Sequence, residues 1–83
     1  MRLRRHPDLL LGWRPEGFLV RNLSSGTGIV GPADVVRILD VFDAPRTPHE
    51  AASLLPDEDR AGLLRDIATL RRLGFLIAGD RPG

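Results

Sequence analysis

The sequence predicts an α+β fold in which a three-stranded antiparallel sheet precedes three helices and a short C-terminal strand. Before residue 31, short apolar runs alternate with turn residues, whereas after it apolar residues recur at helical spacing. The length of 83 residues is that of one small domain. We therefore expect a single domain over residues 1–83, with an ordered core spanning residues 8–78.

Two turns join the three predicted strands. The apolar segment 9–13 is followed by Arg-Pro-Glu-Gly at 14–17, and the second segment, 18–22, is followed by Ser-Ser-Gly at 24–26. Proline and glycine in such short connections are typical of hairpin turns. With segment 27–30 as the third strand, the pattern indicates an antiparallel meander.

The first two helices carry clear start signals. Pro32 suits the first turn of a helix, and apolar residues then recur at helical spacing as far as Phe42. In the second helix, Thr47 is placed to be the N-cap, with Pro48 as the first helical residue and Glu50 completing a capping box. We expect this helix to be short, because a further proline follows it closely.

The third helix is the longest predicted element. The acidic residues 57–59 favour a helix start, and the helix is expected to end near Leu73, with Gly74 terminating it. The apolar residues 75–78 form a short strand, and residues 79–83 are expected to fray. A short turn joins the second and third helices, and the last strand lies where a wing would be. The predicted arrangement is therefore a winged helix-turn-helix.

Composition narrows the classes of function. The formal net charge of +1 excludes a heavily basic nucleic-acid-coating protein. The absence of cysteine excludes disulfides and thiolate chemistry, and it favours a reducing compartment for so small a domain. No apolar run approaches the roughly 20 residues of a membrane span, nor the length of a secretory signal. We expect a cytoplasmic protein with no membrane segment.

No residue pattern in the chain predicts catalysis. Gly26, Gly28 and Gly31 spell a Gly-x-Gly-x-x-Gly motif, but the helix after them leads to another helix and not to a parallel strand, so nucleotide binding is not expected. The two histidines are His6, in an N-terminus expected to be loose, and His49, and they are too few for a structural zinc site. No serine has an evident histidine and acid pairing. We expect no catalytic residue, no metal and no cofactor.

The third helix carries a wider apolar arc than a core face needs. At about 100° per residue, its apolar residues span about 240°, whereas a surface helix needs a stripe of about 100°. One side of this arc reads Arg60, Leu64, Ile67, Arg71, which places two cations around an apolar strip. Either the small sheet covers the extra arc while the arginine stems lie along it, or this side is a groove for an extended peptide with apolar and acidic residues.

The third strand, 27–30, is the second candidate for binding. It is short and contains Gly28, so side-chain packing alone defines it poorly. At a sheet edge, its free N–H and C=O groups would form a template for an added strand, or would simply bond to water. We expect Ile29→Pro to block strand addition by removing an N–H donor.

Five segments together resemble a known family. They read Leu-Leu-Leu-Gly-Trp at 9–13, Phe-Leu-Val-Arg-Asn-Leu at 18–23, Val-Val-Arg-Ile-Leu-Asp-Val-Phe-Asp at 35–43, Arg-Thr-Pro-His-Glu-Ala-Ala at 46–52 and Leu-Arg-Arg-Leu-Gly-Phe-Leu-Ile at 70–77. In this order they resemble the RiPP recognition element, a small winged-helix domain typified by the pyrroloquinoline-quinone biosynthesis peptide chaperone. RiPPs are ribosomally made, post-translationally modified peptides. The opening segment is most similar to versions fused to azoline dehydrogenases.

The resemblance implies a binding function without chemistry. In such domains the leader segment of a precursor peptide adds as a strand to the third strand and fills a groove on the third helix. The domain thereby delivers the precursor to a modifying enzyme, such as a cyclodehydratase or a dehydrogenase. Carried onto this chain, the peptide-binding residues are Thr27, Gly28, Ile29 and Val30 on the strand and Arg60, Leu63, Leu64, Ile67 and Arg71 on the helix.

Two other functions fit the same order of elements. A small winged-helix DNA-binding regulator would place residues 57–59 at the start of its recognition helix, where three acids repel phosphates, so nucleic acid is the less favoured partner. An accessory or dimerisation domain of an enzyme, with no peptide ligand, is the third possibility. The chain fits either a free-standing protein or a domain excised from a larger enzyme.

Overall fold

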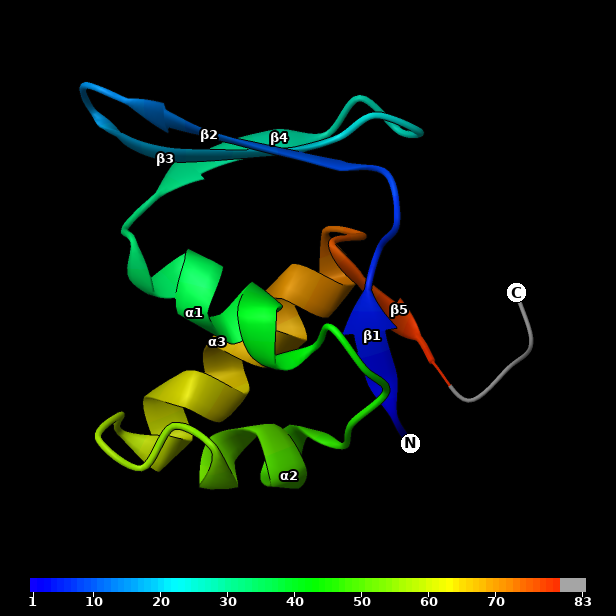
Figure 1. Ribbon diagram of the computed structural model, residues 1–83, viewed down its shortest axis with the longest axis vertical. Helices are drawn as coiled ribbons and strands as arrows, with labels where there is room; N and C mark the ends of the chain where they lie inside the picture. The colour runs from blue at the N-terminus through cyan, green and yellow to red at the C-terminus, as the bar shows by residue number, and fades with distance from the viewer. Residues whose placement is uncertain (80–83) are drawn as a thin grey trace.

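The structure, a computed structural model, describes residues 1–79 (Figure 1). The fold is α+β, with a small antiparallel sheet and three helices, as predicted. In chain order the elements are β1 (Leu3–Arg5), β2 (Leu9–Arg14), β3 (Gly17–Asn22), β4 (Gly28–Gly31), α1 (Asp34–Val41), α2 (Pro48–Ser53), α3 (Arg60–Arg72) and β5 (Leu76–Ala78). Except for Gly79, the segment expected to fray lies outside the described residues.

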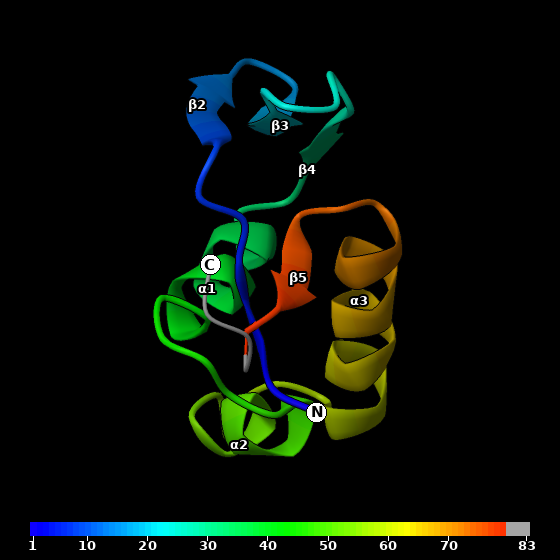
Figure 2. The same ribbon diagram turned by 90° about the vertical axis from the view of Figure 1, so that its right-hand side faces the viewer.

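The predicted meander is confirmed as a three-stranded antiparallel sheet. Its strand order is β2-β3-β4, with Val20 in the central strand opposite Leu11 on one side and Ile29 on the other. All three helices lie on one face of this sheet (Figures 1 and 2). The side chains of Phe18 and Val20 enter the core from that face, since both are buried. The opposite face of the sheet carries the alternate residues of each strand.

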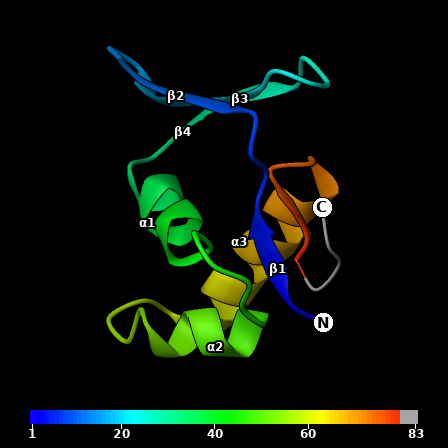
Figure 3. The ribbon, with the colours of Figure 1, turned by 45° about the vertical axis from the view of Figure 1, so that its right-hand side comes forward.

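The strand count differs from the prediction, because the N-terminus is not loose. β1 pairs antiparallel with β5, with Leu3 opposite Ala78, and the two strands form a second small sheet beside α3 (Figure 3). Leu3 is only 2% exposed, and its N–H donates to the carbonyl of Arg46 at 2.7 Å. The last strand is therefore paired with β1 and does not form the projecting wing that its position suggested. Three residues are too few to show a strand pattern in a sequence.

The predicted end signals of α2 and α3 are confirmed, whereas Pro32 lies two residues before the start of α1 and not within its first turn. Thr47 Oγ1 accepts a hydrogen bond from the Glu50 N–H at 3.1 Å, and Glu50 Oε1 accepts one from the Thr47 N–H at 2.8 Å, which completes the capping box of α2. At α3, Asp59 caps the N-terminus by accepting from the Gly62 N–H at 3.0 Å. Gly74 follows the helix with a φ of +88°, a conformation that favours glycine. Within residues 1–79, no helix has the length and apolar character needed to cross a bilayer.

The core lies between the helices and the inner face of the sheet. α1 supplies Ile38 and Leu39, α3 supplies three apolar residues, and the two-stranded sheet closes the far end. The buried apolar residues are Leu3, Phe18, Val20, Ile38, Leu39, Phe42, Ala51, Ala52, Leu55, Leu63, Ile67, Leu70, Phe75 and Leu76.

Asn22 is the buried polar residue of the described chain, at 3% exposure. Its side-chain amide donates to the carbonyl of Gly74 at 2.9 Å, and its side-chain oxygen accepts from the N–H groups of Ser24 and Ser25 at 2.9 and 3.2 Å. Its backbone N–H donates to the carbonyl of Thr27 at 2.8 Å. One residue thus holds the start of β4 next to the C-terminal end of α3.

Candidate functional site

β4 forms one edge of the three-stranded sheet, as the strand-addition hypothesis requires. It pairs with β3 on one side, and within the described residues no strand pairs with its other side. Val30 is 46% exposed, whereas the side chain of Ile29 packs against the core. The strand is only four residues long and includes two glycines.

The pairing with β3 fixes which backbone groups of β4 are free. Residues of an antiparallel strand alternate between bonding to the neighbouring strand and pointing away from it. The bond from the Asn22 N–H to the Thr27 carbonyl places Thr27, Ile29 and Gly31 in the bonded set. The N–H and C=O groups of Gly28 and Val30 therefore face the open edge.

This geometry corrects the expectation for Ile29→Pro. The Ile29 N–H points to β3, so a proline at this position would break the sheet of the domain itself and would not selectively block an added strand. Val30 is the position at which proline removes an N–H donor from the open edge. The sequence showed the strand but not this alternation, because the alternation depends on the register with β3.

On α3, the predicted apolar strip lines a cavity of about 450 Å³. Leu64, Ile67 and Arg71 lie in its wall, as the helical spacing predicted, together with Ala68 and Arg72. The rest of the wall comes from Leu3 in β1 and Pro48 at the start of α2. The cavity thus has an apolar floor and two arginines along one side.

Two of the predicted helix residues do not line this cavity. Leu63 is 4% exposed and belongs to the core, so it is not accessible to a ligand. Arg60 lies at the far end of the helix, with Nη2 3.2 Å from the Nδ1 of His49. Ile67 lines the cavity but is only 1% exposed, so Leu64 and Arg71 are its more accessible predicted residues.

The strand and the helix strip do not form one groove. Within residues 1–79, the cavity on α3 is lined by β1, α2 and α3, and no residue of β4 contributes to it. Nevertheless, β4 and α3 lie on the same side of the molecule (Figure 2). Because Asn22 bonds both Thr27 and Gly74, the start of β4 adjoins the end of α3 that carries Arg71 and Arg72. The β4 edge and the apolar strip of α3 are therefore separate surfaces that adjoin each other at the C-terminal end of α3.

The arginines of the cavity have no carboxylate partner among the described residues. The ion pairs within residues 1–79 are Arg2–Glu50, Arg5–Asp40 and Arg37–Glu58. The acidic cluster before α3 is partly engaged, since Asp59 caps the helix and Glu58 bonds Arg37 at 2.8 Å. The exposed charged residues of α3 are four arginines, Arg60, Arg65, Arg71 and Arg72, and one acid, Asp66, so the helix carries a net positive charge.

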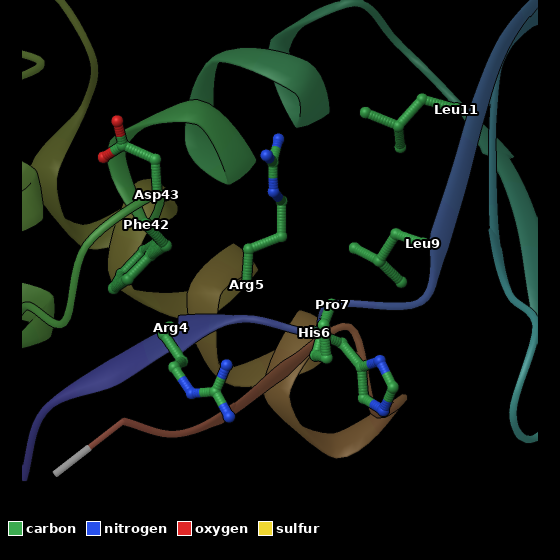
Figure 4. Close-up of a pocket in the computed structure, with 8 residues that line it drawn as sticks. All are labelled: Arg4, Arg5, His6, Pro7, Leu9, Leu11, Phe42 and Asp43. Atoms are coloured by element: carbon green, nitrogen blue, oxygen red, sulfur yellow. The ribbon is translucent and has the colours of Figure 1, made fainter. Parts of the chain in front are cut away.

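A second cavity, of about 260 Å³, lies between the inner face of β2 and the end of α1, and sequence reasoning missed it. Leu9 and Leu11 project from β2 toward Arg5, with Phe42 and Asp43 of the α1 end across from them (Figure 4). Arg4 and Arg5 line this cavity because β1, which carries them, is held in place by its pairing with β5. No signal in the sequence marked β1 as a strand or indicated its pairing with β5.

The glycines of the Gly-x-Gly-x-x-Gly motif form a hairpin turn and part of a strand, as the context of the motif predicted. Gly26 lies in the turn between β3 and β4 with a φ of +78°, and Gly28 and Gly31 belong to β4. The helix that follows leads to α2 and not to a parallel strand. Among the described residues, no group of three or more His, Cys, Asp or Glu side chains is placed to hold a metal ion.

Comparison with protein-family models, with curated proteins and with solved structures gives no match for this chain.

Proposed function

We propose that this domain, a variant of the winged-helix fold acting in the cytoplasm, binds the leader segment of a ribosomally made precursor peptide and presents it to a modifying enzyme. The leader adds as a strand to β4 through the N–H and C=O groups of Gly28 and Val30. It then passes the end of α3 and places an apolar side chain against Leu64, with a carboxylate near Arg71. The domain itself performs no chemistry and raises the effective concentration of the substrate.

One observation carries the proposal. An open strand edge adjoins a helix end whose arginines flank an apolar cavity and have no carboxylate partner within residues 1–79, and Asn22 holds the two together. An extended peptide uses such an edge through its main chain, while the cavity and the cations select its side chains. The carboxylates of an acidic leader are the natural complement of Arg71 and Arg72.

Fluorescence polarisation with a labelled peptide tests this function, using the peptide encoded by the short open reading frame nearest this gene. Val30→Pro removes an edge donor and is expected to weaken binding about tenfold, since one main-chain hydrogen bond and its geometry are lost. Val30→Ala removes the side chain but keeps the N–H, so it is expected to bind normally. Equal affinity of the two variants would contradict strand addition on β4.

A charge-reversal pair tests the helix half of the site. Arg71→Glu is expected to weaken the same peptide about tenfold by repelling its carboxylates. Arg65→Glu makes the same charge change on the same helix but outside the cavity wall, so it is expected to have little effect. If both variants lose affinity equally, the attraction is to the general charge of α3 and not to the cavity.

A second candidate function is DNA binding, favoured by the four exposed arginines of α3. Two observations weigh against it. β5 pairs with β1, so within residues 1–79 it does not project beside the helix as a wing. The N-terminus of α3, which a recognition helix presents to base edges, still carries Asp57 and Glu58. Binding of a random DNA duplex, falling steeply with added salt, in the absence of peptide binding would favour this candidate.

A further inference from the structure

The second edge of the sheet, β2, lacks the features that keep edge strands from pairing. Soluble proteins protect such edges with proline, inward-pointing charges, bulges or short strands. β2 is six residues long, contains no proline and has no charged residue on its inner face. Within the described chain it pairs only with β3. Trp13 lies on the inner face of β2 and is 73% exposed. Its ring contacts that of Phe18 edge to face, with the two ring centroids 4.6 Å apart.

The bonding pattern shows which groups of β2 are free. The Leu23 N–H donates to the carbonyl of Asp8 at 2.9 Å, which places the even-numbered residues of this strand in the set bonded to β3. The N–H and C=O groups of Leu9, Leu11 and Trp13 therefore point to the open edge. Their side chains all lie on the inner face, because their partners in β3 are Asn22, Val20 and Phe18.

One register makes this edge complementary to itself. In an antiparallel pair of two β2 strands centred on Leu11, Leu11 lies opposite its own copy and Leu9 lies opposite Trp13. All three residues with free backbone groups then fall in bonded pairs, so the strands would exchange six hydrogen bonds. Shifting the centre by one residue to Gly12 would set Leu9 opposite Pro15, which has no N–H to donate.

The side chains favour the same register. It places Arg14 directly opposite Asp8 of the second copy at both ends of the paired strands, so opposite charges meet twice. It also places the exposed indole of Trp13 beside Leu9 of the second copy, at the 260 Å³ cavity that Leu9 and Leu11 line with Arg4 and Arg5 (Figure 4). The indole would cover apolar surface there and offer its face to the arginines.

We infer that β2 is a homodimer interface, in which two copies of the chain join edge to edge about a two-fold axis at Leu11. The two sheets become one six-stranded sheet with β2 strands at its centre. The occupant is a second copy because charge, hydrogen-bond pattern and apolar contact agree in a single register. β4 is the weaker candidate for self-pairing, since its free groups come only from Gly28 and Val30.

Sedimentation equilibrium of the full chain without peptide tests the interface. The unmodified protein is expected to pass from monomer to dimer as its concentration rises. Emission of Trp13, the single tryptophan, is expected to shift to shorter wavelength in parallel as the indole is covered. Arg14→Asp is expected to weaken the dimer about tenfold, because it sets like charges opposite each other at both ends.

A charge swap separates the pairing from general electrostatics. The double variant Asp8→Arg/Arg14→Asp restores opposite charges and is expected to dimerise nearly as well as the unmodified chain. Arg21→Asp makes the same charge change on the central strand β3 and is expected to leave dimerisation unchanged. A protein that stays monomeric at every concentration would overturn the inference. A dimer whose stability is unaffected by Arg14→Asp but that is abolished by Val30→Pro would also overturn it, since that dimer would use β4.

Discussion

At the scale of single residues, Asn22 contributes most to the placement of the candidate site. It is buried, and its side chain makes three hydrogen bonds that join the β3–β4 turn to the end of α3. A buried amide of this kind contributes through geometry, because it satisfies its own polar atoms by bonding backbone groups of two separate segments. In the sequence, only its position at a turn marks this asparagine.

Replacing Asn22 tests this role. Asn22→Ala is expected to lower the free energy of unfolding by about 2–4 kcal/mol, since three side-chain hydrogen bonds are lost at a buried position. Urea unfolding followed by circular dichroism measures the change. Ser25→Ala is a matched control, because it keeps the backbone N–H that bonds Asn22 and is expected to cost far less. A similar small loss for both variants would contradict the structural role of Asn22.

At the scale of elements, the local signals in the sequence were reliable where neighbouring residues satisfy each other. The α2 capping box is such a case, because Thr47 and Glu50 are three residues apart and complete it without outside help. The same holds for Asp59 at α3 and for Gly74 after it. By contrast, β1 is an element only because β5 pairs with it, and no local signal marks three such residues.

The capping box also makes a prediction about pH. The hydrogen bond from the Thr47 backbone N–H, followed by that with its side chain, lowers the pKa of the Glu50 carboxyl below its ordinary value of 4.5. A carboxyl with a lowered pKa in the folded state stabilises the fold above pH 4.5, and this contribution is lost as the pH falls through the folded pKa. Glu50→Gln is therefore expected to be less stable than the unmodified chain at pH 7, with the gap in urea midpoint shrinking below pH 4.5.

If the urea midpoints of Glu50→Gln and the unmodified chain differ by the same amount at pH 7 and below pH 4.5, the stated role of the Glu50 charge is contradicted. Glu16→Gln is the control, because Glu16 is exposed in the turn between β2 and β3, away from the caps. Its urea midpoint is expected to follow that of the unmodified chain at both pH values.

At the scale of the whole molecule, the two edges of the sheet lie on opposite sides. β4 lies on the side of α3, and β2 lies on the side of α1 (Figure 2). A peptide added to β4 and a second copy joined to β2 would therefore occupy separate surfaces. The proposed dimer would carry two peptide sites at the outer ends of one continuous sheet.

This separation predicts that the two binding events are independent. Arg14→Asp, which is expected to weaken the dimer, should leave the affinity for the labelled peptide within about twofold, because it lies on the far edge. Val30→Pro should weaken the peptide and leave the dimer unchanged. Fluorescence polarisation and sedimentation equilibrium on the same variants measure both. Loss of both activities in either variant would show that the surfaces are coupled or overlap.

The candidate site was predicted in part. The helical spacing identified Leu64, Ile67 and Arg71 as one strip, and turn residues identified the third strand. The helical spacing itself places Leu63 on the core face, as observed, and only the family resemblance assigned it to the groove. The spacing did not show that Arg60 lies beside His49 or that the strip faces β1 and α2. An over-wide apolar arc indicates that something covers it, but the arc does not say which element does.

The sequence by itself determined the order and type of most elements, because turn residues, helix caps and apolar periodicity act over a few neighbouring positions. Only the tertiary structure decided which edges are open, which backbone groups face them and what lines the cavity on α3. Those features depend on the register of β3 with β2 and β4, which pairs whole strands, and on the pairing of Leu3 with Ala78, residues at opposite ends of the described chain. Local patterns carry no information on such contacts, and both proposed binding surfaces depend on them.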